Sequence, residues 1–202
     1  MIWQEHRETF YCGCKYDKYG VINYKTCSYI PVDKRKDKKI TWEHVVAASW
    51  YGKQFPCWKK PLCSDNNGKK YKGRSCCQKI EKKFQEMEAD LHNLVPAIRT
   101  VNSARSNYHF GEFYPENKQH KFNVNHCPII IDEHYQIVEP RDEVKGFVAR
   151  VHLYMADKYG IRLSEREKKL FADWNKRFSP TAWERRWNQK VGAIQGDLNP
   201  YI

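Results

Sequence analysis

The chain has 202 residues, of which 41% are hydrophobic and 14% aromatic; this excludes an intrinsically disordered protein and is enough for one domain with a sizeable core. Its 36 Lys and Arg residues outnumber 24 Asp and Glu residues, and the formal net charge of +12 favours a polyanionic partner. Nucleic acid is the first expectation, with an anionic membrane surface or glycan as alternatives, and no apolar stretch approaches the ~18 residues of a membrane span.

Eight cysteines occur in the first two thirds of the chain, and they are Cys12, Cys14, Cys27, Cys57, Cys63, Cys76, Cys77 and Cys127. No two of them form a Cys-x-x-Cys pair, which argues against a zinc ribbon or a thioredoxin-like redox site. We therefore predict four disulfide bonds and a secreted or periplasmic protein. The first residues, MIWQEHRETF, lack the apolar core of a signal peptide, so we expect that an export signal was removed and Met1 added.

The composition changes once along the chain. Roughly the first 135 residues are rich in cysteine, glycine, lysine and aromatics and contain strand-like segments such as VINY (21–24) and HCPIIID (126–132). Roughly the last 60 residues have helical periodicity. We find no repeat or linker, so we predict one α+β domain over residues 1–202, with a helical C-terminal part and stabilising disulfides.

The basic run DKRKDKK (33–39) contains two aspartates, and we interpret it as a solvated loop rather than a binding site. The next segment, ITWEHVVAAS (40–49), places Glu43 beside His44 in a strand-like sequence. In an extended backbone the two side chains point to opposite faces. They can serve one site only if the chain bends there or a ligand lies to the side.

A second polar cluster is EADLHNLVPAIRTVNSARSNY (88–108). Pro96 suits a first helical position, so we predict a helix from Pro96 to about Ala104. The apolar residues of this segment would form the buried side of the helix and leave Asn102 at its edge.

Two C-terminal helices are predicted from periodicity and capping. The segment GFVARVHLYMADKYG (146–160) has apolar residues at helical spacing and ends with Gly160. In the second helix, Ser164 and Glu167 form a capping box. Its apolar stripe consists of Leu170, Phe171, Trp174 and Phe178.

A third helix is predicted to start within SPTAWERRW (179–187), with Pro180 in its first turn. Trp183, Trp187 and Val191 follow one another at intervals of four residues. This spacing favours packing in the core over stacking on nucleic-acid bases.

Several segments, in one order along the chain, resemble the endonuclease I family of periplasmic and secreted bacterial nucleases. They are FYCGC (10–14), WEHVV (42–46), MEADLHNLVPAI (87–98), VN (101–102), RSN (105–107), and IQG (194–196) followed by NP (199–200). The resemblance covers nearly the whole chain. It implies a ββα-metal (His-Me finger) active site, one divalent cation, and cleavage of DNA and RNA without sequence preference to leave 5′-phosphate ends.

The resemblance also assigns four site residues. His44 matches the family's general base, and Glu43 and Asn102 match two protein ligands of a magnesium ion, for which Ca²⁺ or Mn²⁺ are possible substitutes. Arg74, in GRSCC, matches an arginine that stabilises charge in the transition state, although this match depends on counting back from MEADL. The chemistry agrees, because an imidazole accepts a proton near neutral pH and magnesium prefers oxygen ligands.

Three features depart from the family pattern. Ala47 replaces a proline after WEHVV, and Ser103 and Ala104 replace the glycine and aspartate that usually follow VN. These changes affect local loop geometry rather than the catalytic atoms. The third departure is an extra cysteine pair, Cys63 and Cys76, while the usual C-terminal cysteines are absent.

The predicted disulfide pairs are Cys14–Cys27, Cys12–Cys127, Cys57–Cys77 and Cys63–Cys76. Adjacent Cys76 and Cys77 should have different partners, because a bond between them would strain the peptide unit that joins them. The short sequence separation supports the first pair, and nesting around Arg74 supports the last two. This set is one of ~105 possible pairings.

Other polar residues are rival candidates for the site. We interpret His92 and Asn93 as structural or supporting residues, and Glu88 and Asp90 as helix caps, salt-bridge partners or residues that order a lysine or a metal-bound water. The remaining histidines lack metal-ligand spacing; they are His6, His109, His120, His126, His134 and His152.

Two functions remain as hypotheses from the sequence. The first is a magnesium-dependent, sugar-nonspecific endonuclease that acts as a monomer on DNA and RNA and does not bind membranes. The second is an exported basic protein that binds nucleic acid or an acidic glycan without catalysis. The presence of Glu43, His44 and Asn102 favours the endonuclease, because binding alone does not require them.

Overall fold

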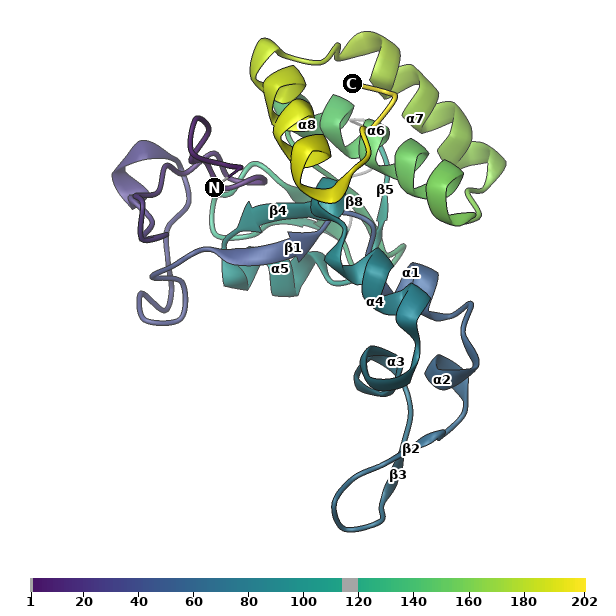
Figure 1. The fold of residues 1–202 in the computed structure, drawn as a ribbon. Coiled ribbons are helices and arrows are strands. Elements are labelled where there is room, and N and C mark those ends of the chain that lie inside the picture. Colours follow the sequence, from purple (N-terminus) through teal and green to yellow (C-terminus); the bar gives the residue numbers. More distant parts are fainter. Residues whose placement is uncertain (1, 114–119) are drawn as a thin grey trace.

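The computed structural model describes residues 2–113 and 120–202 and has a mixed α+β fold, as predicted (Figure 1). The strands are β1 (Thr41–His44), β2 (Cys63–Ser64), β3 (Lys70–Tyr71), β4 (Leu94–Ala97), β5 (His109–Phe110), β6 (Lys121–Asn123), β7 (Ile130–Asp132) and β8 (Ile137–Glu139). The helices are α1 (Ala48–Gly52), α2 (Pro56–Lys59), α3 (Arg74–Ile80), α4 (Lys82–Ala89), α5 (Arg99–Arg105), α6 (Asp142–Tyr159), α7 (Glu165–Arg177) and α8 (Ala182–Gln195). Short 3₁₀ helices are η1 (Tyr24–Thr26) and η2 (Leu91–Asn93).

Strands β1 and β4 pair antiparallel, and α5 follows β4 directly, so β1, β4 and α5 form a ββα unit. The predicted helix from Pro96 was wrong at its start. Pro96 lies in β4 opposite Trp42, and the helix begins at Arg99. Extended pairing with β1 overrides the local preference of proline for a first helical turn, and a proline is tolerated because this ladder has only two strands.

The basic run 33–39 is largely exposed, as expected, but its second aspartate is an exception. Asp37 is completely buried. Its Oδ1 accepts a hydrogen bond of 3.0 Å from the backbone N–H of Thr100, and its Oδ2 accepts one from the hydroxyl of Tyr29. Because α5 has no capping side chain of its own, Asp37 supplies the missing acceptor at its N-terminus.

Between β1 and β4 the chain leaves the ββα unit and builds a separate lobe from α1 to α4. In Figure 1 this lobe extends downward from β1 and β4, and the β2–β3 hairpin projects from its end. The Cys57–Cys77 bond joins α2 to α3, and the Cys63–Cys76 bond joins β2 to α3. These two disulfides link short elements, a four-residue helix and a two-residue strand, to α3.

All four predicted disulfide pairs are confirmed. The other two are Cys12–Cys127 and Cys14–Cys27, and no cysteine is free. The Cys12–Cys127 bond spans 115 residues and ties the N-terminal loops to the segment before β7. The N-terminal region therefore depends on covalent links more than on strands: VINY, predicted to be strand-like, makes only isolated bridges, such as Val21 with Lys39.

A second sheet has the strand order β5-β8-β7-β6, in which β5 and β8 are parallel and the other pairs are antiparallel. The predicted strand in HCPIIID is therefore confirmed as β7. Ile129, Ile131 and Val138 are completely buried and contribute this sheet's part of the hydrophobic core.

The C-terminal helices pack together and gather above β1 and β4 in Figure 1. Gly160 ends α6 in a left-handed conformation, and Ser164 and Glu167 form the predicted capping box of α7. Helix α8 begins at Ala182, not in the turn that contains Pro180, because the side chain of Thr181 caps it by accepting from the N–H of Glu184.

The aromatic residues of these helices form core rather than an exposed stacking surface. Trp187 and Val191 are buried, and Trp183 packs against Trp3 with ring centroids 5.1 Å apart. The core interpretation of this stripe is therefore confirmed. Within residues 2–113 and 120–202, no helix is long and apolar enough to cross a bilayer.

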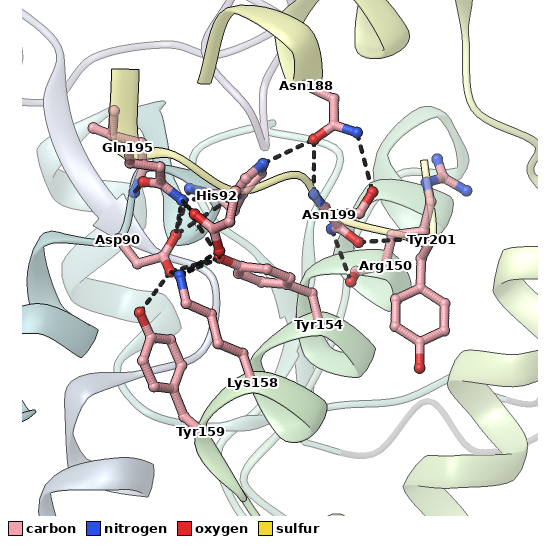
Figure 2. Close-up of polar contacts among 12 residues, drawn as sticks. Asp90, His92, Arg150, Tyr154, Lys158, Tyr159, Asn188, Gln195, Asn199 and Tyr201 are labelled. Carbon is pink, nitrogen blue, oxygen red and sulfur yellow. Dashed lines mark hydrogen bonds and ion pairs between the residues drawn. The ribbon is translucent and has the colours of Figure 1, made fainter. Parts of the chain in front are cut away.

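A buried polar network joins η2 to the C-terminal helices (Figure 2). Asp90 accepts hydrogen bonds from the hydroxyls of Tyr154 and Tyr159 and forms an ion pair with Lys158, 2.9 Å away. Gln195 donates to Asp90 from α8. Burial by itself raises the pKa of Asp90, but the contacts with His92, Lys158 and Tyr159 outweigh it, so its pKa is lowered and the carboxylate stays charged.

A second part of this polar network holds the C-terminal end of the chain in place. The Oδ1 of Asn188 accepts from the backbone N–H of Asn199 and, at 2.8 Å, from Nε2 of His92. Asn199 in turn donates to the carbonyl oxygen of Arg150. The segments 194–196 and 199–200 therefore hold α8 and the C-terminal residues against α6 and η2. This accounts for asparagine, rather than an apolar residue, at the buried position 199.

Candidate active site

Four residues that lie far apart in the sequence line one cavity of about 270 Å³. They are Glu43, His44, Arg74 and Asn102. Glu43 and His44 come from the end of β1, Arg74 from the first turn of α3, and Asn102 from the middle of α5. Although Glu43 and His44 are adjacent on a strand, β1 ends at His44 and the chain bends at residues 45 and 46. Both side chains therefore border the same cavity.

Asn93 fixes the bend after His44. Its carbonyl oxygen accepts from the N–H of Val45, its Oδ1 accepts from the N–H of Val46 at 2.7 Å, and its Nδ2 donates to the carbonyl oxygen of Val46. These contacts replace the strand pairing that stops at His44. Asn93 thus has a structural function, as the sequence suggested.

Glu43 is only 4% exposed, and two partners hold its carboxylate. Its Oε1 accepts from the hydroxyl of Tyr11 at 3.0 Å and lies 3.1 Å from NH1 of Arg105. Burial raises the pKa of Glu43 above its usual value. The charge of Arg105 and the hydrogen bond from Tyr11 offset this rise only in part. A cation bound beside this carboxylate would lower the free-energy cost of keeping its negative charge buried.

The imidazole of His44 is oriented by the main chain. Its Nε2 lies 2.8 Å from the carbonyl oxygen of Glu88 at the end of α4. A carbonyl oxygen can only accept, so Nε2 carries the proton and Nδ1 is the basic nitrogen in the neutral ring. Burial lowers the pKa of His44, the hydrogen bond to the carbonyl oxygen of Glu88 acts in the opposite direction, and the positive charge of Arg74 lowers it further. The pKa is lowered overall, which favours the neutral form.

Asn102 of α5 contacts β1. Its amide nitrogen donates to the carbonyl oxygen of Trp42 at 3.3 Å. With the nitrogen used in this way, its Oδ1 is the atom that can act as an acceptor or a ligand. Although α5 begins at Arg99 and not at Pro96, Asn102 lies on this helix as predicted.

Arg74 is anchored at one end and half-exposed. Its Nε lies 2.5 Å from Oε1 of Glu88, and both oxygens of that carboxylate also accept from Gln78. The side chain of Glu88 is thus a salt-bridge partner, while its carbonyl oxygen orients His44. One residue therefore positions both His44 and Arg74.

Arg105 and Tyr11 also hold the site, although the sequence did not indicate a role for either residue. Arg105 is 1% exposed, forms the ion pair with Glu43, and donates to the carbonyl oxygens of His44 and Val45. Both residues lie in segments that carried the family resemblance, FYCGC and RSN, but a tyrosine or arginine alone gives no sign of its partner. Tyr11 is 32 positions from Glu43 in the sequence and forms a side-chain hydrogen bond with it, and Arg105 is 62 positions from Glu43 and forms an ion pair with it.

The rival polar residues lie outside the cavity. Asp90 and His92 belong to the network of Figure 2, and His152 is buried between Trp50 and Phe171. Burial lowers the pKa of His152 to about 3, so this ring is neutral. In the part of the chain that the structure describes, no group of three or more His, Cys, Asp and Glu side chains is arranged to bind a metal.

Comparisons with known proteins identify the family of this chain. The family model for endonuclease I matches residues 4–202. A periplasmic deoxyribonuclease of Aeromonas hydrophila is 35% identical over 100% of this chain and 80% of its own length. Endonuclease-1 of Buchnera aphidicola subsp. Acyrthosiphon pisum is 39% identical over 96% of this chain and 73% of its own length.

A more distant relative is an extracellular ribonuclease of Bacillus amyloliquefaciens, which is 31% identical over 56% of this chain and 43% of its own length. The relatives are thus named as nucleases, and several of them as periplasmic or extracellular. A family match over almost the whole chain, together with a ββα unit that carries the cavity, shows that this chain belongs to the endonuclease I family.

Proposed function

We propose that this protein is an exported endonuclease that hydrolyses phosphodiester bonds in DNA and RNA without sequence preference. The observation that carries the proposal is the single cavity lined by Glu43, His44, Arg74 and Asn102. It combines a basic nitrogen, two oxygen ligands and a cation, which are the groups that phosphodiester hydrolysis needs. The names of the relatives, deoxyribonuclease, endonuclease and ribonuclease, support the same reaction class.

His44 is the proposed general base. With Nε2 committed to the carbonyl oxygen of Glu88, Nδ1 accepts the proton of a water molecule as that water attacks phosphorus. The bond from phosphorus to the 3′ oxygen then breaks, so the products carry 5′-phosphate ends. Arg74, held at its Nε by Glu88, offers its remaining N–H groups to the phosphoryl oxygens as their charge grows.

The residues of the cavity fit a divalent cation with few protein ligands. Magnesium prefers oxygen ligands and keeps several waters, so a carboxylate from Glu43 and the Oδ1 of Asn102 are a sufficient anchor. Tyr11 and Arg105 both contact Oε1 of Glu43, which makes Oε2 the better placed oxygen. A bound magnesium ion would supply positive charge to the phosphate and the leaving oxygen. Ca²⁺ or Mn²⁺, which also take oxygen ligands, are possible substitutes.

Digestion of a supercoiled plasmid and of a structured RNA tests the proposal. The protein should cut both in the presence of magnesium, stop when a chelator is added, and recover when magnesium is returned in excess. A basic protein that only binds nucleic acid would retard the plasmid on a gel and leave it intact under all three conditions. That result would establish the binding hypothesis instead.

A further inference from the structure

A larger cavity, of about 700 Å³, lies directly beside the candidate active site. The residues that line it include Trp50 of α1, Lys53, Lys59 and Arg162, which lies between α6 and α7. Asn107 lines both this cavity and the catalytic one. The two cavities are therefore neighbours, and the proposed reaction does not use the larger one.

Two hydrogen bonds hold the wall that the cavities share. Nδ2 of Asn107 donates to Oγ of Ser49, which borders the catalytic cavity, and Nε1 of Trp50 donates to the carbonyl oxygen of Asn107; each bond is 3.1 Å long. Consecutive residues of α1 thus face the two cavities. A ligand that crosses this wall would contact both sites.

The larger cavity presents positive charge that is available to a ligand. Lys53, Lys59 and Arg162 are exposed, and their side chains form no hydrogen bond or ion pair within residues 2–113 and 120–202. Glu167, an acidic residue in the wall, is already paired with His109 at 2.8 Å and with Ser164. The unpaired groups are therefore cations, which suits a ligand with more than one negative charge.

An aromatic surface lies among these cations. The rings of Trp50 and His109 have centroids 4.2 Å apart and planes inclined by 33°. Trp50 is only partly buried, and 57% of the His109 side chain is exposed. Aromatic rings among basic side chains are the combination that single-stranded nucleic acids require, because unpaired bases stack on the rings while cations contact the phosphates.

We propose that the larger cavity binds nucleotides that flank the scissile phosphate when that part of the substrate is single-stranded. The bases would contact Trp50 and His109, and the phosphates Lys53, Lys59 and Arg162. A duplex keeps its base faces covered and would use only the cations. The inference rests on the proposed function, because it places the scissile phosphate in the adjacent cavity, and it adds a preference for unpaired strands at one side of the cut.

Binding of a single-stranded oligonucleotide and of a blunt duplex of equal length tests this proposal. The measurements use a His44→Ala background in the presence of a chelator, so that no strand is cut. The test variant is Lys53→Ala/Lys59→Ala/Arg162→Ala. The matched control, Lys169→Ala/Lys176→Ala/Arg185→Ala, removes the same charges from exposed positions on α7 and α8 that line neither cavity.

For the single strand, the slope of log Kd against log salt should fall by about 2 in the test variant, since each lost phosphate contact contributes ~0.7. The control variant should lose much less. Trp50→Ala should weaken single-strand binding about tenfold and leave duplex binding unchanged, whereas Trp50→Phe should keep most of the affinity. Circular dichroism would show that each variant is folded.

Equal losses in the test and control variants would overturn the proposal, as would a Trp50→Ala effect of the same size on single strand and duplex. If the Trp50 variants do not fold, the comparison of the two triple variants decides by itself. Failure of the proposed function looks different, because then the wild-type protein would not cut either nucleic acid with magnesium. Binding in the chelator would still report on the larger cavity.

Discussion

At the scale of single residues, the candidate site depends on how two neighbours, Glu43 and His44, are held. Glu43 is fixed by Tyr11 and Arg105, whereas His44 is fixed by a main-chain carbonyl from α4. Adjacent residues are thus supported by different parts of the chain and offer different chemistry, a ligand oxygen and a basic nitrogen. Substitutions at these two positions should therefore impair different properties, proton transfer at His44 and metal binding at Glu43.

His44→Ala should lose about 10²-fold or more in the rate of cleavage, the usual contribution of a positioned general base, and keep its affinity for DNA. Glu43→Ala and Asn102→Ala should instead weaken metal binding, so that part of their loss is recovered at high magnesium. The measurement is the cleavage rate against magnesium concentration, with DNA binding measured in parallel. His134→Ala, an exposed histidine elsewhere, is the control. A His44→Ala protein that cuts at nearly the wild-type rate would show that the imidazole is structural.

Glu167 should make the stability of the protein dependent on acid pH. Burial raises its pKa, but hydrogen bonds from His109 and Ser164 outweigh this and lower it from 4.5 to about 2. A carboxyl whose pKa is lower in the folded state stabilises the fold above its unfolded pKa, and this stability is lost as the pH falls from about 4.5 towards 2. Glu167→Gln should remove this contribution.

Between pH 5 and pH 3 the wild type should therefore lose about 2 kcal/mol more of its free energy of unfolding than Glu167→Gln does. Urea denaturation at both pH values measures the difference. Parallel losses in the two proteins would mean that Glu167 has an ordinary pKa in the folded state.

At the scale of elements, the lobe between β1 and β4 brings Arg74 to the cavity. Arg74 begins α3, and α3 is tied to β2 by Cys63–Cys76 and to α2 by Cys57–Cys77. Gly73, just before it, has φ of +87°, a backbone conformation that glycine adopts without strain. The position of Arg74 thus depends on this turn and on two disulfides, in addition to its ion pair with Glu88.

The double variant Cys63→Ser/Cys76→Ser should lose about 3 kcal/mol of stability, from the greater freedom of the unfolded chain, and should also cut more slowly because Arg74 is less well fixed. Cys14→Ser/Cys27→Ser is a close control, since both bonds span 13 residues and the second joins N-terminal loops. The control should lose similar stability and keep its rate of cleavage when assayed well below its melting temperature. Equal rates in the two double variants would show that the Cys63–Cys76 bond does not position Arg74.

At the scale of the whole molecule, the net charge of +12 and the open catalytic cavity suggest binding through phosphates rather than bases. The Kd of the His44→Ala variant should rise linearly with salt on a log–log plot. Unrelated duplexes of equal length should give the same line. Filter binding from about 50 to 200 mM salt measures it. A strong preference for one sequence at matched salt would point to direct contacts with base edges instead.

Much of this molecule follows from short-range patterns in the sequence. The capping box of Ser164 and Glu167, the stop at Gly160, the buried stripe around Trp187 and the complete oxidation of the cysteines depend on local spacing or on residue counts. The ordered motifs also led to the endonuclease I family and to the four residues of the cavity. Where prediction failed, at Pro96 and Pro180, a strand partner or a neighbouring cap overrode the preference of a single proline.

Only the tertiary structure showed how the site is held together. The contacts of Glu43 with Tyr11 and Arg105, of His44 with the carbonyl of Glu88, and of Asp37 with the start of α5 join segments that are distant in sequence. A sequence pattern records which side chains are polar, but a hydrogen bond also depends on where the partner lies after folding. The identity of the candidate site residues was therefore predicted from the sequence, and their orientation and charge state are determined by the packing of the whole chain around them.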